Sequence, residues 1–199
     1  MKTFLFGNAK GKTEIIVRIA IMMALTVLMQ FVTGFAKIQL LTGSFVNLFL
    51  FLSVMLTGLV GGLCVGVVTP FIALAFGLNP NILLVPFIAL ANGIMTATFA
   101  LVCKLLKVES REIGWQIAIV ALAIVLGATL KFLFMYFVCV KLIFPLFMAD
   151  KMLKAVSVAF GVTQLFTALI GGLVATMLVY PLKRAKLLFS PAQPQEQNL

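Results

Sequence analysis

One lysine, Lys131, lies within a stretch of otherwise apolar or small residues, LGATLKFLFMYFV (126–138). An ammonium group at bilayer depth costs about 2.5–3.5 kcal/mol on insertion scales, so such a residue normally has a function. Its charge either binds an anionic group inside a helix bundle, or is carried by the long side chain to the lipid headgroups. We favour the first alternative. Lys141, further along the same segment, is expected to be an anchor at the membrane surface.

Uncharged amide side chains in other apolar segments could share the depth of Lys131. They are Gln30, Asn47, Asn81, Asn92 and Gln164. At a helical rise of about 1.5 Å per residue, most of them fall in the same half of the predicted membrane region as Lys131, and Asn92 lies nearer its middle. Together these polar groups predict a substrate-binding pocket that opens at one face of the membrane.

Simpler roles for the amides stay open at this point. Gln164 and Asn92 could form hydrogen bonds between helices, whereas Asn47 and Asn81 could cap helix ends. Glycine and alanine residues lie one turn from Lys131 and along the predicted face of Gln164. Because small residues allow helices to approach closely, we expect both polar side chains to face the bundle rather than lipid.

Groups suited to catalysis are scarce in the apolar segments. The chain has no histidine, and its five acidic residues lie in predicted tails or loops: Glu14, Glu109, Glu112, Asp150 and Glu196. Proton relays use buried carboxylates or histidines, and hydrolases need a base beside a nucleophile or a metal. CxxC spacing is absent among the cysteines, which lie in separate apolar segments: Cys64, Cys103 and Cys139. We therefore expect no enzyme activity, no metal and no cofactor.

The composition identifies the class of protein. Of the 199 residues, 63% are hydrophobic and only 10% are charged, and the mean hydropathy is +1.23. A soluble domain could not cover that much apolar surface, and apolar stretches of about 20 residues recur along the chain, which indicates an all-α integral membrane protein. The net charge of +10 comes from basic residues at the ends of these stretches. Flanking of membrane spans explains that charge, and no nucleic-acid partner is expected.

Six transmembrane helices are predicted, at about 15–34, 45–62, 63–76, 82–106, 115–142 and 156–181. The second and third are separated by length alone, because residues 45–76 contain no charge and are long for one span but short for two. Gly61-Gly62 is the expected break between them. Pro70 and Pro86 should bend or interrupt their helices, as membrane helices tolerate when neighbours satisfy the freed carbonyl groups.

Lysine and arginine counts set the orientation. Basic residues cluster before the first span, at 104–111 and at 183–186, which places both termini in the cytoplasm. Lys37 and the predicted MADKMLK loop (148–154) place a smaller number of basic residues on the outside, against this rule. Residues 1–187 are expected to form a single transmembrane domain, and the polar residues 188–199 a disordered tail.

Two small-residue motifs suggest close helix contacts. GLVGGLCVG (58–66) contains glycines spaced by four, and would form a tight cytoplasmic hairpin if the chain turns at Gly61-Gly62. RIAIMMAL (18–25) places Ala20 and Ala24 one turn apart in the first span. Internal helix packing is the simpler interpretation of either motif.

In the order and spacing of these motifs, the whole chain resembles the substrate-binding S-components of energy-coupling factor (ECF) vitamin transporters. The resemblance implies a six-helix bundle in the bacterial plasma membrane. It also implies that Ala20 and Ala24 form a docking motif for a transmembrane coupling subunit, which is energised by two cytoplasmic ATPases. A pocket near the outer surface would include KIQLLTGSFVN (37–47), ALANGIMT (89–96), LKFLFMY (130–136) and GVTQLFTALIGG (161–172).

The function implied is high-affinity binding of a small water-soluble vitamin or precursor for import. Lys131 favours an anionic group such as a carboxylate, which pantothenate or niacin would supply, although a pyridoxine- or pyrimidine-like ligand is a further alternative. A competing class is a membrane scaffold of the cell-shape type, which would need neither a pocket nor a deep lysine. An independent facilitator would need a continuous polar path, against which the apolar inner half argues.

Overall fold

The computed structural model describes residues 12–35, 38–78 and 81–184, with side chains as far as residue 179. No strand occurs in these ranges. The predicted tail 188–199 and Lys37 lie outside the described residues.

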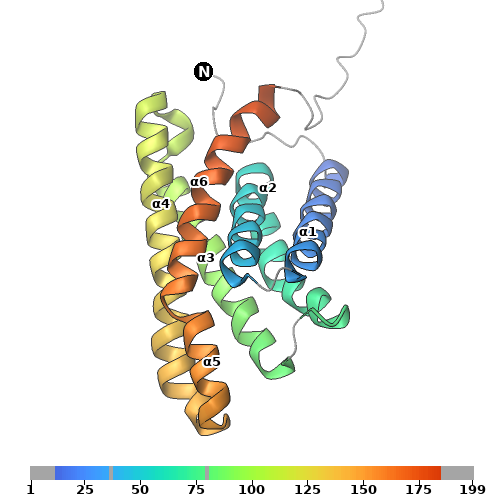
Figure 1. Cartoon of the computed structure of the whole chain (residues 1–199). Coiled ribbons are helices and arrows are strands. Elements are labelled where there is room, and N and C mark those ends of the chain that lie inside the picture. Colours follow the sequence, from blue (N-terminus) through green and yellow to red (C-terminus); the bar gives the residue numbers. More distant parts are fainter. Residues whose placement is uncertain (1–11, 36–37, 79–80, 185–199) are drawn as a thin grey trace, which may run out of the picture.

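The described residues form one bundle of helices (Figure 1). Its long elements are α1 (Lys12–Gly34), α2 (Gln39–Ala75), α3 (Val85–Leu105), α4 (Ile113–Leu133), α5 (Asp150–Phe160) and α6 (Val162–Arg184). Short elements join them: η1 (Ile82–Leu84), η2 (Val108–Ser110), the π-helix η3 (Phe134–Ile143) and η4 (Phe144–Leu146). Because α2 packs against α1, α3 and α6, it is the central element of the bundle.

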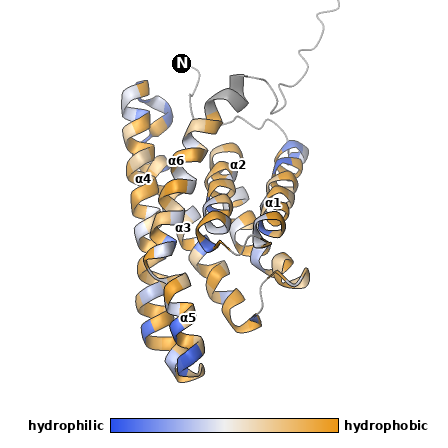
Figure 2. Ribbon diagram, in the orientation of Figure 1, coloured by the Kyte–Doolittle hydropathy of each residue, from blue (hydrophilic) through white to orange (hydrophobic). Residues whose placement is uncertain are grey.

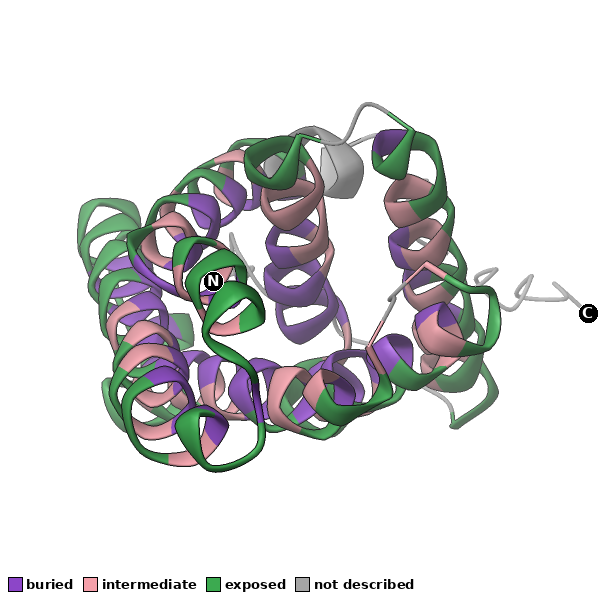
Figure 3. Ribbon diagram, turned by 60° about the horizontal axis from the view of Figure 1, so that its bottom comes forward, coloured by how far each residue is buried: buried purple, intermediate pink, exposed green. Residues whose placement is uncertain are grey.

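Hydrophobic residues predominate along the helices of this bundle (Figure 2). Within the described residues, five helical segments are long and apolar enough to cross a membrane: Lys12–Gly34, Gln39–Ala75, Ile82–Leu105, Ile113–Leu146 and Asp150–Val179. Figure 3 shows the buried residues on the helix sides that face one another and exposed residues around the periphery. Since the exposed residues include many leucine, valine and phenylalanine side chains, the outer surface suits lipid.

The helix α2 is broken at Gly58, where φ is 75° and ψ is −166°. A straight helix of 37 residues would extend about 55 Å. Instead, a Cβ built on Gly62 would lie 2.2 Å from Cγ2 of Val54, eight residues earlier, so the chain turns back on itself. The predicted break within 45–76 is therefore present, but its position at Gly61-Gly62 was wrong. The turn uses a backbone conformation open essentially only to glycine, and Gly62 then allows close packing of the two halves.

Replacing Gly58 by alanine is expected to destabilise the protein by about 1–3 kcal/mol, because any Cβ is strained at this φ and ψ. Collision with the rest of the protein does not contribute, since no atom outside the adjoining backbone lies within 4 Å of the Cβ position. Gly114→Ala is the matched control, because that position is equally open and lies within α4. Unfolding of the two variants in detergent would measure the difference, and equal stabilities would contradict the assigned turn.

The last two predicted spans differ from the observed helices in detail. The segment 148–154, expected to be a loop, is helical from Asp150, because the sequence that follows is amphipathic and buries Val156 and Phe160. This helix, α5, ends at Gly161, where ψ is −138°, and α6 begins at the next residue. The fifth predicted span ended near residue 142, and the helical segment continues past it to 146 as η3 and η4.

Arg18 joins α1 to the turn of α2. Its side chain is buried, Nη1 donates a hydrogen bond to the carbonyl of Leu56 at 3.1 Å, and Nη2 pairs with Glu14. Leu56 lies two residues before the turn at Gly58, where backbone carbonyls lose their helical donors. Glu14, expected in the N-terminal tail, thus lies in the first turn of α1. The guanidinium holds the hairpin of α2 against α1.

Candidate functional site

Lys131 lies in α4 and points into the bundle. Its side chain is 3% exposed, and Nζ donates hydrogen bonds to Oδ1 of Asn47 at 2.7 Å and to Oδ1 of Asn92 at 2.8 Å. Asn47 belongs to α2 and Asn92 to α3, so three helices meet at this ammonium group. The alternative in which Lys131 extends to the headgroups is therefore wrong.

The two asparagines are oriented by their own partners. Nδ2 of Asn47 donates to Oγ1 of Thr167 in α6 at 3.1 Å. Oγ1 of Thr167 in turn donates to the carbonyl of Gln164 at 3.1 Å. With its amide nitrogen engaged in this way, Asn47 directs its carboxamide oxygen to the ammonium of Lys131 and stabilises the charge.

A proline explains the partner of Asn92. Pro70 lies inside α2 and has no N–H, so the carbonyl of Gly66, four residues earlier, loses its helical donor. Nδ2 of Asn92 donates to this carbonyl at 3.3 Å. The expectation that a neighbour satisfies a carbonyl freed by Pro70 is confirmed. Pro86, in contrast, lies in the first turn of α3 and does not interrupt it.

The ammonium of Lys131 carries the only charge of the cluster. A lysine ammonium has three N–H donors, and two of them bind the asparagine oxygens. Among the residues that the structure describes, no third acceptor and no carboxylate contacts Nζ, and the single ion pair found there joins Arg18 to Glu14. The cluster can therefore accept one further oxygen atom, preferably one with negative charge.

A cavity of about 290 Å³ lies against this cluster. Lys131, Asn47 and Asn92 contribute to its wall. Its other polar side chains are Gln30, Gln39, Thr42, Thr69 and Gln164. Its apolar wall includes Pro70, Leu78, Ile88, Met135 and Phe160. An apolar wall with a few converging polar groups is typical of small-molecule sites.

Of the residues predicted from the sequence, Lys131, Asn47, Asn92, Gln164 and Gln30 come together around this cavity. Asn47 lies inside α2, so the alternative that it caps a helix is wrong. Gln164 also forms a hydrogen bond between consecutive helices, from its Nε2 in α6 to the carbonyl of Ala159 in α5 at 3.0 Å.

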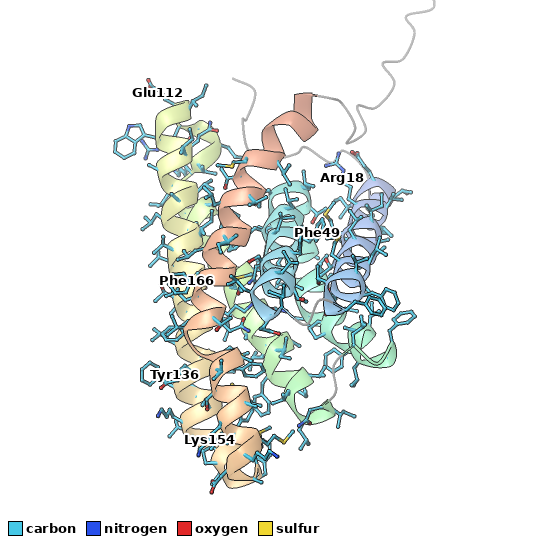
Figure 4. All side chains as sticks on the ribbon, viewed as in Figure 1. Arg18, Phe49, Glu112, Tyr136, Lys154 and Phe166 are labelled. Carbon is cyan, nitrogen blue, oxygen red and sulfur yellow. The ribbon has the colours of Figure 1, made fainter. Side chains whose placement is uncertain are left out.

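Asn81 is not among the residues of the cavity wall. Its Oδ1 accepts the N–H of Leu83 at 2.9 Å, which is the capping role that the sequence left open. Its Nδ2 lies 3.8 Å from Sδ of Met152 in α5. The expected anchor Lys141 also lies away from the cavity, with Nζ 5.4 Å from the centre of the Tyr136 ring. Figure 4 shows Tyr136 projecting outward from the bundle.

Sequence reasoning did not single out Gln39, Thr42, Thr69 or Phe160. Gln39 and Thr42 lie within KIQLLTGSFVN, and a helical period continued backward from Asn47 would have found Gly43 and Gln39 on its face. Thr69 directly precedes Pro70, the residue that leaves the Gly66 carbonyl free to accept a hydrogen bond from Asn92. No comparable signal exists for Phe160, because its position depends on the break at Gly161.

Gly171 brings α6 close enough for Thr167 to reach Asn47. A Cβ on Gly171 would lie 2.6 Å from the backbone nitrogen of Leu48 and 2.7 Å from the carbonyl oxygen of Ser44. Backbone atoms cannot move aside as side chains do, so any larger residue must separate α6 from α2.

Gly171→Ala is expected to destabilise the protein by about 1–3 kcal/mol, the range for overpacked sites. Gly93→Ala is the matched control, since a Cβ there meets only side-chain atoms at 3.5 Å and 3.9 Å. Thermal unfolding of both variants measures the effect. Destabilisation of the Gly93 variant to the same degree would show that helix glycines are generally sensitive in this bundle.

Ala20 and Ala24 are exposed on α1 and are not among the residues of the substrate cavity. They border an apolar groove of about 630 Å³ between α1 and the end of α2. The opposite wall of the groove includes Ile72 and Phe76. This groove can receive an apolar partner, because small residues permit close approach of another helix.

The comparisons with known proteins agree with this geometry. The family model described as "ECF transporter, substrate-specific component" matches residues 15–183. No curated protein and no solved structure matches the chain.

Proposed function

This chain belongs to the substrate-specific components of ECF transporters, and we propose that it captures a small water-soluble vitamin or vitamin precursor that carries one carboxylate. Members of this family are substrate-binding subunits of membrane transporters rather than enzymes, and they associate with a coupling subunit and ATPases.

The observation that carries the proposal is the buried ammonium of Lys131 at the cavity wall. It has two amide acceptors and no carboxylate partner within the described residues. Burial of a charge without an opposite charge is costly, and a ligand carboxylate would supply that charge. Because one N–H donor is left over, a single carboxylate oxygen fits better than the doubly charged phosphate of a phosphorylated vitamin.

The size and lining of the cavity support a small ligand. Its volume, about 290 Å³, is at the lower end of the usual range for ligand sites. The amides of Gln30, Gln39 and Gln164 offer hydrogen bonds to hydroxyl or amide groups. Pantothenate and niacin combine a carboxylate with modest size, whereas pyridoxine-like molecules lack the negative charge.

We further propose six membrane crossings, with both termini in the cytoplasm. The two halves of α2 would each cross once, and α5 with α6 would form the last crossing. Arg18 and Glu112 lie at one end of the bundle, where α1 begins and α6 ends, and Lys154 lies at the other (Figure 4). The basic residues at 104–111 favour the first end as cytoplasmic, in a bacterial plasma membrane.

The exposed alanines of α1 are the proposed contact with the coupling subunit. Ala20 and Ala24 border the apolar groove beside α2. Their own helix, α1, is the least buried of the membrane-spanning candidates. This chain would then capture the substrate, and the partner ATPases would supply the energy for its import. A scaffold protein would need neither the cavity nor the buried ammonium.

The test is thermal stabilisation of the purified protein by a panel of vitamins and precursors, each carboxylic acid paired with its neutral amide. A ligand that binds only the folded state raises the unfolding temperature by mass action. We expect an acid to stabilise the protein and its amide to have little effect. Stabilisation by an uncharged vitamin alone would contradict the carboxylate, and no response to any compound would contradict the vitamin class.

A further inference from the structure

A second groove lies on the surface of the bundle, near the start of α4 and thus at the opposite end of this helix from Lys131. Its volume is about 290 Å³, and it is separate in its residues from the substrate cavity. Its walls are formed by Leu106, Arg111, Trp115, Ala118, Ile119 and Leu122. It thus lies between the end of α3 and the first turns of α4.

The apolar part of the groove is elongated along α4. Trp115, Ala118, Ile119 and Leu122 follow the helical spacing of one face and extend about 10 Å along the axis. Ile119 is buried and forms the floor, whereas Trp115 and Leu122 are exposed on the rim. A narrow apolar channel parallel to a membrane helix matches the shape of an acyl chain.

The end of the groove carries the positive charge of Arg111. Gln116 is buried and donates from Nε2 to the carbonyl of Arg111 at 2.8 Å, which holds the backbone of the arginine against α4. Among the described residues, Arg111 forms no ion pair within 4.0 Å. Arg111 lines the end of the groove without a carboxylate partner, so its guanidinium is available to bind a phosphate.

Neighbouring charges leave this end positive. Lys104 and Lys107 precede Arg111, and Glu109 and Glu112 are the acidic residues of the same connection. Lys107 occupies the left-handed region, with φ of 50°, at a position after a helix end where glycine is usually preferred. Figure 4 shows Glu112 at the extreme end of α4, away from the body of the bundle.

We propose that this groove binds an anionic phospholipid, with its phosphate on Arg111 and one acyl chain along α4. The charge at the head and the apolar channel below it are complementary to the two parts of such a lipid. Trp115 is exposed in the first turn of α4, and tryptophan is enriched at membrane–water interfaces. Basic pockets between membrane helices on the cytoplasmic side are a recognised form of lipid site.

Trp115 provides the test, because it is the only tryptophan of the chain. The full-length protein is reconstituted in vesicles that contain a small fraction of phosphatidylglycerol or phosphatidylcholine with brominated acyl chains, which quench nearby tryptophan. We expect brominated phosphatidylglycerol to quench Trp115 with about fivefold higher relative affinity, the preference that one basic residue near an anionic lipid supplies.

Arg111→Gln should remove this preference, whereas the control Lys154→Gln, at the far end of the bundle, should keep it. Equal quenching by the two lipids in the wild type would overturn the proposal, as would an unchanged preference in Arg111→Gln. Loss of the preference on adding inorganic phosphate would assign the arginine to a soluble anion instead. If the two brominated lipids quenched Trp115 equally and addition of the coupling subunit abolished both signals, the groove would be a protein contact.

Discussion

Replacement of Lys131 by methionine is expected to weaken binding of the carboxylated ligand at least about thirtyfold. Removal of one partner from a buried, hydrogen-bonded charge pair costs about 2–5 kcal/mol of binding free energy. Methionine has a similar length but no charge, so it fills the space of the lysine stem between Asn47 and Asn92. Titration of the ligand against the purified variant and the wild type measures the loss.

The unliganded Lys131→Met variant should remain folded, with a stability within about 2 kcal/mol of the wild type. The variant avoids the desolvation cost of burying an ammonium, which is several kcal/mol. It also leaves two amide oxygens without their donor, and this loss offsets the gain. The matched control is Lys141→Met, the same substitution in an exposed lysine of the same helical segment. Undiminished affinity in the Lys131 variant, with the fold intact, would place the carboxylate elsewhere.

Replacing both Ala20 and Ala24 by leucine is expected to abolish uptake and to leave ligand affinity unchanged. Both alanines are exposed and border the groove on α1, and two larger side chains would fill the space that a partner helix needs. Neither residue contributes to the wall of the substrate cavity, so capture of the ligand should continue. Uptake in cells that also contain the coupling subunit and ATPases is compared with binding to the purified protein.

Ala121→Leu is the control for this second prediction. Ala121 is an exposed alanine on α4, outside the groove beside α1. Uptake should be normal in the control if the effect depends on the α1 surface. Full uptake by the Ala20→Leu, Ala24→Leu double variant would show that the partner binds another face, whereas lost ligand binding would indicate a damaged fold.

The residues of the polar cluster could be found from the sequence, for a physical reason. A charge or amide within an apolar helix has few partners in a membrane, so Lys131, Asn47 and Asn92 were expected to line one pocket, although a helix cap stayed open for Asn47. The sequence did not give the pairing itself, because Asn47 and Lys131 are separated by 84 positions. It also left the direction of the Lys131 side chain open, since lysine can reach the membrane surface.

Backbone breaks were the harder part of the prediction. Gly58, Gly61 and Gly62 all lie in one short motif, and composition does not tell which of them adopts the glycine-only conformation. The observed position depends on tertiary contacts such as the bond from Arg18 to Leu56. Likewise, Asn47 and Asn81 have the same side chain, yet only the second caps a helix, because the first lies inside α2.

The most direct test of the proposed function is the dissociation constant of one carboxylic acid ligand beside that of its neutral amide, measured on the wild-type protein. Both compounds have nearly the same size and would fill the same cavity. With Lys131 as the anion-binding group, the acid should bind at least about tenfold more tightly, because a hydrogen bond to a charged group contributes about 1.5–3 kcal/mol. Equal affinities of acid and amide would contradict a carboxylate site at Lys131.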